Sequence, residues 1–399
     1  MSGPLTGVRV IEICSAISGP FAGKLLGDLG AEVIKVESID TGAADRVRDL
    51  PYDRHGNDEF TWRFLNYNTN KRSVAVDLKT EEGTELLEEL LTDADVLLEN
   101  MRPGSMERLG YDWESLQEHN SGLVYCSIKG YGADGPYTDF PALDTLIQGV
   151  SGFATQVGSD EGPGTMEILV IDMMTGLYSA WSITAALFER HASGQGQRIE
   201  ISMLDTAVSM LGHQLAEYTA AQHHEDVEPE FGTRFVPKGF YATAEGEIAL
   251  FIGDHWEEFC SVIDRPEWAD PEHPYGTNDQ RLERQDEFRD DLELVLSART
   301  ADEWIEYFKE CEETVLAAPV NRIDELVDDP QIQAQEAITK RTHPEMGEYY
   351  MPNVVPKFSR TGGSLSDAPS VGESTDRILE RLGYDADERA ALRDKSVVD

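Results

Sequence analysis

One aspartate in this sequence combines a reactive group with surroundings that would exclude water. Asp172 follows the apolar run Ile168–Ile171 and precedes Met173-Met174-Thr175-Gly176. The pattern predicts that Asp172 opens a helix, where its carboxylate would accept a backbone N–H as an N-cap. The other interpretation is a carboxylate nucleophile. An aspartate with its ordinary pKa of about 3.9 is ionised at pH 7, and apolar walls would protect an acyl intermediate from hydrolysis. The residues alone favour the cap.

Two basic stretches could bind an anionic ligand. One is Asn70-Lys71-Arg72-Ser73, followed by Lys79, and the other is Glu99–Gly104, followed by Arg108. We expect both at the ends of parallel strands, and such sheets bind ligands at their carboxyl edge. Arginine, lysine and free backbone N–H groups there suit phosphates. The alternative is a set of surface cations that pair with the abundant acids.

Other familiar motifs are absent or weak. The opening strand–helix–strand unit ends at Glu37, where a dinucleotide fold would place a ribose-binding acid. Its glycines (19, 23, 27 and 30) do not form G-x-G-x-x-G, and their spacing favours close helix–sheet packing. His223-His224 lies in a polar stretch without metal-ligand spacing, so we expect no metal. There is no G-x-S-x-G elbow for a serine hydrolase.

Strand and helix patterns alternate over the first part of the chain, which predicts an α/β fold with a parallel sheet. We expect strands at residues 8–13, 32–37, 73–78, 95–99, 123–128 and 197–203. We expect helices up to Leu29 and at residues 80–93, 172–190 and 204–221. A smaller α/β domain should contain a hairpin at 239–251 and helices at 256–263, 280–298 and 301–311, and the tail a strand at 352–358 and a helix at 374–382. The predicted organisation is a large domain at 1–222, a linker at 223–237, a small domain at 238–325 and a return segment at 326–399.

Composition limits the partners and the compartment. The 399 residues include 76 acidic and 33 basic ones, a net charge of −43. Such a chain repels nucleic acids and anionic membranes. The even acidic coat, with 10 lysines against 23 arginines, is typical of cytosolic proteins of salt-loving microbes, in which salt screens the repulsion. Four scattered cysteines fit a reducing cytosol. With no signal-peptide pattern and no apolar run of about 18 residues, we expect a cytoplasmic protein.

Taken together, these stretches resemble one family, the class III CoA-transferases (the formyl-CoA and carnitine-CoA transferase group). The matching pieces, in the family's order, are residues 7–37, 70–79, 99–116, 127–137 and 170–205, with a weaker match at 372–385. The resemblance implies a large Rossmann-like α/β domain built from both chain ends, a small inserted α/β domain and an interlocked homodimer. It implies an acyl-CoA and a small carboxylic acid as substrates. Coenzyme A then enters as a thioester substrate, and neither a prosthetic group nor a metal is needed.

The resemblance also assigns residues. It makes Asp172 the catalytic nucleophile, which carries CoA through an aspartyl-CoA thioester. Three pairs of residues match contacts that the family makes with CoA. A fourth pair matches the loop that faces the acyl thioester. These residues are Val76 and Lys79, Asn100 and Met101, Arg108 and Leu109, and Ala16 and Ile17.

Three departures from the family pattern bear on the substrate. Many members carry arginine where this chain has Ser38, and Arg46 or Arg48 would have to compensate. Formyl-CoA transferases carry glutamine at the position of Ile17, and their glycine-rich lid has no match here, so a formyl or oxalyl substrate is not expected. The related 2-methylacyl-CoA racemases pair the aspartate with a histidine, because racemisation needs an acid and a base. This chain has Ala142-Leu143-Asp144 in that stretch.

Dicarboxylates are the acceptors that we expect. Four arginines could clamp a second carboxylate: Arg46, Arg48, Arg72 and Arg234. Haloarchaeal members of the family transfer CoA from succinyl-CoA to mesaconate, and the chain resembles these. Two alternatives stay open at this point: a racemase of the same fold, and a non-catalytic CoA- or nucleotide-binding protein in which Asp172 only caps a helix.

Overall fold

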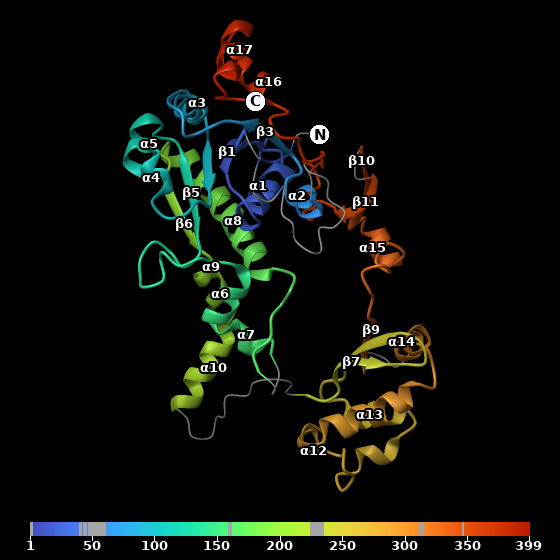
Figure 1. Cartoon of the computed structure of the whole chain (residues 1–399). Coiled ribbons are helices and arrows are strands. Elements are labelled where there is room, and N and C mark those ends of the chain that lie inside the picture. The colour runs from blue at the N-terminus through green and yellow to red at the C-terminus, as the bar shows by residue number, and fades with distance from the viewer. Residues whose placement is uncertain are drawn as a thin grey trace. The chain divides into compact units, whose positions relative to one another are not determined.

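The computed structural model describes residues 3–39, 42, 46, 61–158, 162–223, 235–310, 315–344 and 347–399 (Figure 1). The chain divides into two compact units. One combines Met1–Glu217 with Glu336–Asp399, and the other is Tyr218–Gln335. The small domain expected at 238–325 falls inside the second unit. Each unit has its own hydrophobic core.

A six-stranded parallel sheet forms the centre of the large unit, and the predicted α/β class is confirmed. Its strand order is β3-β2-β1-β4-β5-β6. The strands are β1 (Arg9–Ile13), β2 (Glu32–Glu37), β3 (Lys71–Ala75), β4 (Val96–Glu99), β5 (Val124–Lys129) and β6 (Arg198–Ser202). The order reverses between β1 and β4, and a crevice at such a switch point is where open α/β sheets bind ligands.

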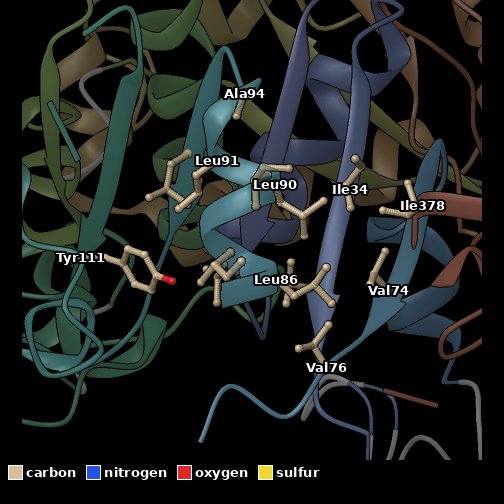
Figure 2. Close-up of a cluster of buried hydrophobic side chains, with 14 of the residues drawn as sticks. Ile34, Val74, Val76, Leu86, Leu90, Leu91, Ala94, Tyr111 and Ile378 are labelled. Atoms are coloured by element: carbon tan, nitrogen blue, oxygen red, sulfur yellow. The ribbon is translucent and has the colours of Figure 1, made fainter. Parts of the chain in front are cut away.

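The strands are apolar on both sides because helices cover both faces of the sheet. Alternate residues such as Val10 and Val33 pack with α1 (Ser18–Asp28) and α8 (Val170–Ser193). Their neighbours Ile11 and Ile34 belong to the core of the other face. Figure 2 shows this second cluster, where leucines of α3 (Glu81–Thr92) gather with Ile34 and Val74 of the sheet and Ile378 of α16 (Thr375–Leu382).

Glycines let α1 approach its neighbours, as their spacing indicated. A Cβ at Gly23 would stand 1.8 Å from Oε2 of Glu12 in β1. A Cβ at Gly176 of α8 would stand 2.6 Å from the carbonyl oxygen of Ser18 at the start of α1. Since neither contact is tolerable, only glycine allows α1 to lie this close to β1 and α8.

The remaining helices and strands of the large unit are shorter. Between β2 and β5 lie α2 (Trp62–Tyr67), α4 (Ser105–Arg108) and α5 (Trp113–His119). After β5 come α6 (Asp144–Ser151), α7 (Phe153–Gln156) and, beyond β6, α9 (Met203–Ser209). The return segment contributes a hairpin of β10 (Ile338–His343) and β11 (Gly347–Pro352), then α16 and α17 (Ala386–Asp394). The helix α10 (Gly212–His223) leads into the second unit.

The second unit packs helices around a three-stranded antiparallel sheet in the order β7-β8-β9. Its aromatic core includes Trp256, Phe259, Phe288 and Phe308. The expected hairpin is present as β7 and β8. The elements are β7 (Lys238–Ala242), β8 (Glu247–Phe251), α11 (Trp256–Val262), the 3-10 helix Pro266–Ala269, α12 (Asn278–Glu283), α13 (Gln285–Leu296), α14 (Ala301–Lys309), β9 (Leu316–Pro319) and α15 (Pro330–Ala334).

Several local predictions were wrong. The helix expected at 204–221 is broken into α9 and α10 before Gly212, a poor helix former. The strand expected at 352–358 is absent; β11 ends at Pro352, and proline donates no ladder hydrogen bond. The strand expected at 73–78 runs over Lys71–Ala75, because Val76 leaves the ladder and bridges Val398. The β10–β11 hairpin and α17 were not foreseen.

Candidate active site

The loop after β1 and the loop after β4 are joined at the switch point. The backbone N–H of Ser15 donates to Oδ1 of Asn100 at 2.9 Å, and Nδ2 of Asn100 donates to the carbonyl oxygen of Ser15 at 2.7 Å. The next residue, Ala16, holds a left-handed φ of 62°, which a residue with a Cβ adopts only under constraint. Ile17 is buried and precedes the first residue of α1, Ser18. Three of the predicted site residues, Ala16, Ile17 and Asn100, thus lie together at the switch point.

Asp172 lies beside Ser18, at the start of α1, but it is not the N-cap of its own helix. The helix α8 begins at Val170, its N-cap is Leu169, and that residue makes no side-chain cap. The backbone N–H groups of Ile171 and Asp172 instead donate to Oδ2 of Asp144, at 2.8 and 3.0 Å. The interpretation of Asp172 as a cap is therefore wrong, because a second aspartate satisfies these orphan donors. The Asp172 carboxyl is therefore not used to cap its own helix.

The environment of Asp172 changes its acidity. Burial and then the negative charge of Asp144 raise the pKa of Asp172 to about 7, against hydrogen bonds from the side chain and backbone of Ser18 and the charge of Arg63. The expectation that this carboxyl is fully ionised at pH 7 was wrong, because half-burial beside a like charge disfavours the anion. A carboxyl with a pKa near 7 is a candidate functional group.

A buried glutamate organises the turn after β4. Glu99 accepts the backbone N–H of Met101 at 2.7 Å. It also pairs with Nζ of Lys129, at the end of β5, at 2.9 Å, and the same Nζ donates to the carbonyl oxygen of Met101 at 2.9 Å. The conformation of Met101 is therefore fixed by its neighbouring strand. Sequence reasoning missed Lys129, although it stands within the family-like stretch 127–137, and it missed Ser18 and Asp144.

Val76 and Lys79, the two site residues expected after β3, differ in burial: Val76 lies in the core and Lys79 at the surface. Val76 is 2% exposed and its side chain packs in the core with Val398. Only its backbone lies at the carboxyl edge, where its N–H donates to the carbonyl oxygen of Glu37. Lys79 is exposed in the turn that follows, and its N–H donates to Asp77. Lys79 thus presents a cation at the carboxyl edge of the sheet, two strands from β1.

The last expected pair lies on α4 and just beyond it. Arg108 is exposed and donates to Oγ of Ser105 at 2.8 Å. Leu109 is half-buried and packs against the core beneath. A cation beside an apolar surface can bind the phosphate and adenine parts of one ligand. This pair follows the Asn100–Met101 turn in sequence, on the carboxyl side of β4.

Two of the arginines proposed as carboxylate clamps have structural roles instead. Arg46 is fully buried and makes two hydrogen bonds to Glu37, at 2.8 and 2.7 Å. Burial alone would raise the pKa of Glu37, but the hydrogen bond from Arg46 and the charge of Lys35 outweigh it and lower this pKa. Arg72 pairs with Glu32 at the amino edge of the sheet, the edge opposite the loops of Ser15 and Asn100. Arg48 and Arg234 lie outside the described residues.

The basic stretch at 70–73 also differs from its prediction, since it begins β3 and does not follow it. The Nζ of Lys71 is buried and donates to Glu12, Asn68 and the carbonyl oxygen of Pro20. Burial lowers the pKa of Lys71 to about 8. This lysine supports the start of α1 from below and is closed to an external phosphate.

The described residues contain no group of three or more His, Cys, Asp or Glu side chains that could hold a metal ion. No helix within the same ranges is long and apolar enough to cross a membrane. Cys14, Cys126 and Cys260 are buried free thiols, and Cys311 lies outside the described residues.

Comparison with known proteins agrees with this geometry. The sequence matches CoA-transferase family III over residues 5–375. It is 36% identical to a succinate–glutarate CoA-transferase of Agrobacterium fabrum, over 83% of this chain and 84% of that enzyme. It is 31% identical to a succinyl-CoA–D-citramalate CoA-transferase of Chloroflexus aurantiacus, over 99% and 98%. A formyl-CoA:oxalate CoA-transferase of Escherichia coli is 30% identical over the full length of both chains.

The fold gives the same assignment. A crystal structure of a CaiB/BaiF family protein from Brucella suis superposes with a TM-score of 0.83 at 30% identity, and covers 96% of this chain and 100% of that one. The three enzymes named above are all CoA-transferases. The chain therefore belongs to CoA-transferase family III and is an enzyme that transfers CoA between acyl-CoA thioesters and carboxylic acids.

Proposed function

We propose that Asp172 is the nucleophile, and that the enzyme moves CoA from succinyl-CoA to a second dicarboxylic acid through an aspartyl-CoA thioester. The observation that supports this is the placement of the Asp172 carboxyl. It is released from helix capping, half-buried, and hydrogen-bonded to Ser18 beside the loop that carries Ala16 and Ile17. A shielded carboxylate at the switch point suits repeated acyl transfer.

The transfer has four balanced steps. The ionised Asp172 carboxylate attacks the donor thioester carbonyl; the C–S bond breaks, and a mixed anhydride and CoA thiolate result. The thiolate attacks the aspartyl carbonyl and releases the donor acid as its carboxylate. The acceptor carboxylate attacks the aspartyl-CoA thioester and expels the thiolate again. The thiolate then attacks the acceptor acyl carbonyl of the new anhydride and regenerates the Asp172 carboxylate.

The exposed cations at the carboxyl edge are proposed to hold CoA. Lys79 and Arg108 are exposed and suited to its phosphates. The half-buried Met101 and Leu109 offer apolar surface to the adenine or pantetheine. Val76 would contribute through its backbone, since its side chain is buried. The turn at Asn100 would then set the distance between the thioester and Asp172.

The choice of dicarboxylates follows from the relatives. The names of two of them pair succinate or succinyl-CoA with glutarate or D-citramalate. Mesaconate is an unsaturated dicarboxylic acid of similar length and is one acceptor that we propose. The formyl-CoA:oxalate enzyme is a relative too, but the apolar side chain of Ile17 replaces the glutamine that formyl-CoA transferases carry, so a formyl donor is not proposed.

We further propose a homodimer with interlocked subunits. The long helix α8 exposes Leu177, Trp181 (65% exposed) and Phe188 (81% exposed). Large apolar side chains gathered on one element mark an interaction surface. A dimer should resist exchange of subunits: tagged and untagged dimers, once mixed, should yield mixed dimers only after unfolding and refolding. Mixed dimers formed within minutes of mixing would contradict interlocking.

We place the enzyme in the cytoplasm of a cell with high internal salt. The net charge of −43 is much larger in magnitude than solubility requires. Concentrated salt screens the repulsion between such charges.

The decisive experiment is a screen of acyl-CoA donors against carboxylic acids in about 1 M KCl, where screening is strong. Transfer should occur from succinyl-CoA to a dicarboxylate without accumulation of free CoA. Asp172→Asn and Asp172→Ala should lose transfer while CoA binding and the folded state persist. Mass spectrometry of the intact protein with succinyl-CoA alone should show Asp172 carrying CoA. Full activity of Asp172→Ala would refute the proposed nucleophile.

A further inference from the structure

A second aspartate supports the nucleophile from another helix. Asp144 is the first residue of α6 and is 2% exposed. Its Oδ2 accepts the N–H groups of both Ile171 and Asp172, which lie in the first turn of α8. Helices are usually capped by the residue just before them, but Leu169 has no side-chain oxygen to offer. The cap of α8 therefore comes from 28 residues away in sequence.

The same network holds the segment that leads into α8. One turn along α6, Gln148 donates from Nε2 to Oδ1 of Asp144 and to the carbonyl oxygen of Met166, and its Oε1 accepts the N–H of Met166 at 2.9 Å. Gln148 is fully buried. Between Met166 and the helix, Leu169 holds a left-handed φ of 52°. A branched residue keeps such a conformation only when its surroundings impose it.

We propose that Asp144 is the positioning residue for the nucleophile: it caps α8 from α6, so that the Asp172 carboxyl faces Ser18 and the acyl group and is not spent on its own helix. This inference rests on the proposed role of Asp172. It assigns to Asp144 no contact with substrate. It predicts that the reaction depends on a side chain that stands apart from the bond-making atoms.

The charge of Asp144 has a second effect on the reaction. The groups that act electrostatically on Asp172 are Asp144 from α6, Arg63 and Tyr67 from α2, and the hydrogen-bonding Ser18 from α1. Among them only the carboxylate of Asp144 places negative charge beside the nucleophile. The anhydride and the thioester carry no charge at Asp172, so they escape this repulsion, whereas the free carboxylate does not. Asp144 thus favours the acylated enzyme over the resting one.

The test separates the cap from the charge. Asp144→Asn keeps an oxygen acceptor for the two N–H groups and removes the charge, whereas Asp144→Ala removes both. For Asp144→Asn, we expect the ascending limb of the pH profile of kcat/KM to move to lower pH by about one pH unit, since a neighbouring like charge is lost. For Asp144→Ala we expect kcat to fall at least about 100-fold while the KM for acyl-CoA stays within about threefold, because a misplaced nucleophile weakens the chemical step.

The matched control is another aspartate that caps a helix with two N–H bonds. Asp385 accepts the N–H groups of Asp387 and Glu388 at the start of α17. Asp385→Asn should leave kcat and the pH profile unchanged. If Asp144→Ala does not fold, Asp144→Asn alone decides the question.

The outcomes are distinct from those that concern the nucleophile. Asp144→Asn with a wild-type pH profile, whether or not kcat falls, would overturn the inference, since a purely structural cap would give that result. Asp172→Asn is measured alongside. If it retains transfer, the proposed nucleophile fails; if it is inactive while Asp144→Asn and Asp144→Ala behave as wild type, only the role of Asp144 fails.

Discussion

The carboxamide of Asn100 makes two hydrogen bonds to the backbone of Ser15, as acceptor from its N–H and as donor to its carbonyl oxygen. These two bonds join the loops that follow β1 and β4, where the strand order of the sheet reverses. The resemblance to the family gave Asn100 a direct contact with CoA. The geometry adds a structural role for Asn100, because Ser15, which it holds, directly precedes Ala16 with its left-handed backbone conformation.

Replacement of Asn100 should therefore affect catalysis as well as binding. For Asn100→Ala we expect kcat/KM to fall about 10- to 100-fold, since loss of both bonds lets the loop after β1, which we propose faces the acyl group, shift. Asn120→Ala is the matched control: that carboxamide also bonds backbone carbonyl oxygens, those of Leu91 and Ala94, but it follows α5. It should lose stability and keep its steady-state kinetics. Equal kinetics for the two variants would contradict the role of Asn100.

The acidity of Asp172 predicts the pH dependence of the rate. With a pKa of about 7, Asp172, the proposed nucleophile, is half-protonated in the free enzyme at neutral pH. Because only the carboxylate attacks, kcat/KM should rise with pH through about 7 and then level off. An ascending limb near pH 4, the ordinary range of an aspartate, would contradict the shifted acidity.

The same group links stability to pH. The folded protein retains the Asp172 proton up to about pH 7, whereas the unfolded chain releases it near the ordinary value of 3.8. Between these values the native state binds more protons, so the contribution of this group to the free energy of unfolding falls as pH rises. Asp172→Asn escapes this loss. Chemical denaturation should show that the stability advantage of Asp172→Asn over wild type grows between about pH 4 and about pH 7.

The contact between α1 and α8 predicts an intolerant glycine. In Gly176→Ala the new Cβ would meet the carbonyl oxygen of Ser18 at 2.6 Å. The helices must separate, at a loss of about 1–3 kcal/mol in the free energy of unfolding, and the hydrogen bonds from Ser18 to Asp172 should weaken with them. Gly149→Ala in α6 meets nothing within 4 Å and should be neutral or stabilising. Thermal melts and kcat of both variants provide the check.

Replacement of Arg46 and of Arg72 should have different effects on the free energy of unfolding. Arg46→Ala leaves the buried Glu37 without its bidentate partner and should destabilise the fold by about 3–5 kcal/mol. Arg72→Ala loses a partly exposed pair with Glu32, worth less than about 1 kcal/mol. Neither change should alter the KM for a dicarboxylate acceptor in the folded fraction. A raised acceptor KM in Arg72→Ala would restore the clamp interpretation.

Salt should stabilise this protein strongly. With a net charge of −43, self-repulsion is screened over a Debye length of about 10 Å at 0.1 M salt and about 3 Å at 1 M. We expect both the melting temperature and kcat to rise between these two KCl concentrations. Sucrose at equal osmolality separates screening from exclusion effects. A flat response to KCl would contradict adaptation to high salt.

The sheet was predictable because its strands are buried on both faces. Runs such as Val8–Ile13 and Glu32–Glu37 are rich in Val and Ile, and this local signal survives in the fold. The buried charges were not predictable. Lys35 and Lys71 both bond Glu12 from separate strands, and no local pattern announces a pair that forms only when the sheet assembles.

The site was predictable where a motif carries it and not where the tertiary structure supplies it. Asp172 could be identified from the apolar run that precedes it and from the helix pattern that follows it. Its raised pKa depends on burial and then on Asp144, which lies 28 residues earlier and was noticed only for the histidine missing beside it. The clamp interpretation was wrong for Arg46 because this side chain is buried against Glu37, and for Arg72 because charge alone does not show which edge of the sheet a side chain occupies.

The edge strand β3 is completed by residues that come much later in the chain. The N–H of Ala75 donates to Oγ1 of Thr375, 300 residues away, and Val76 bridges Val398. During synthesis this edge, and with it the turn that presents Lys79, must wait until the whole intervening unit Tyr218–Gln335 has left the ribosome. That unit has its own aromatic core and can fold first, so the inserted unit of the nascent enzyme can form before the edge at β3 is complete.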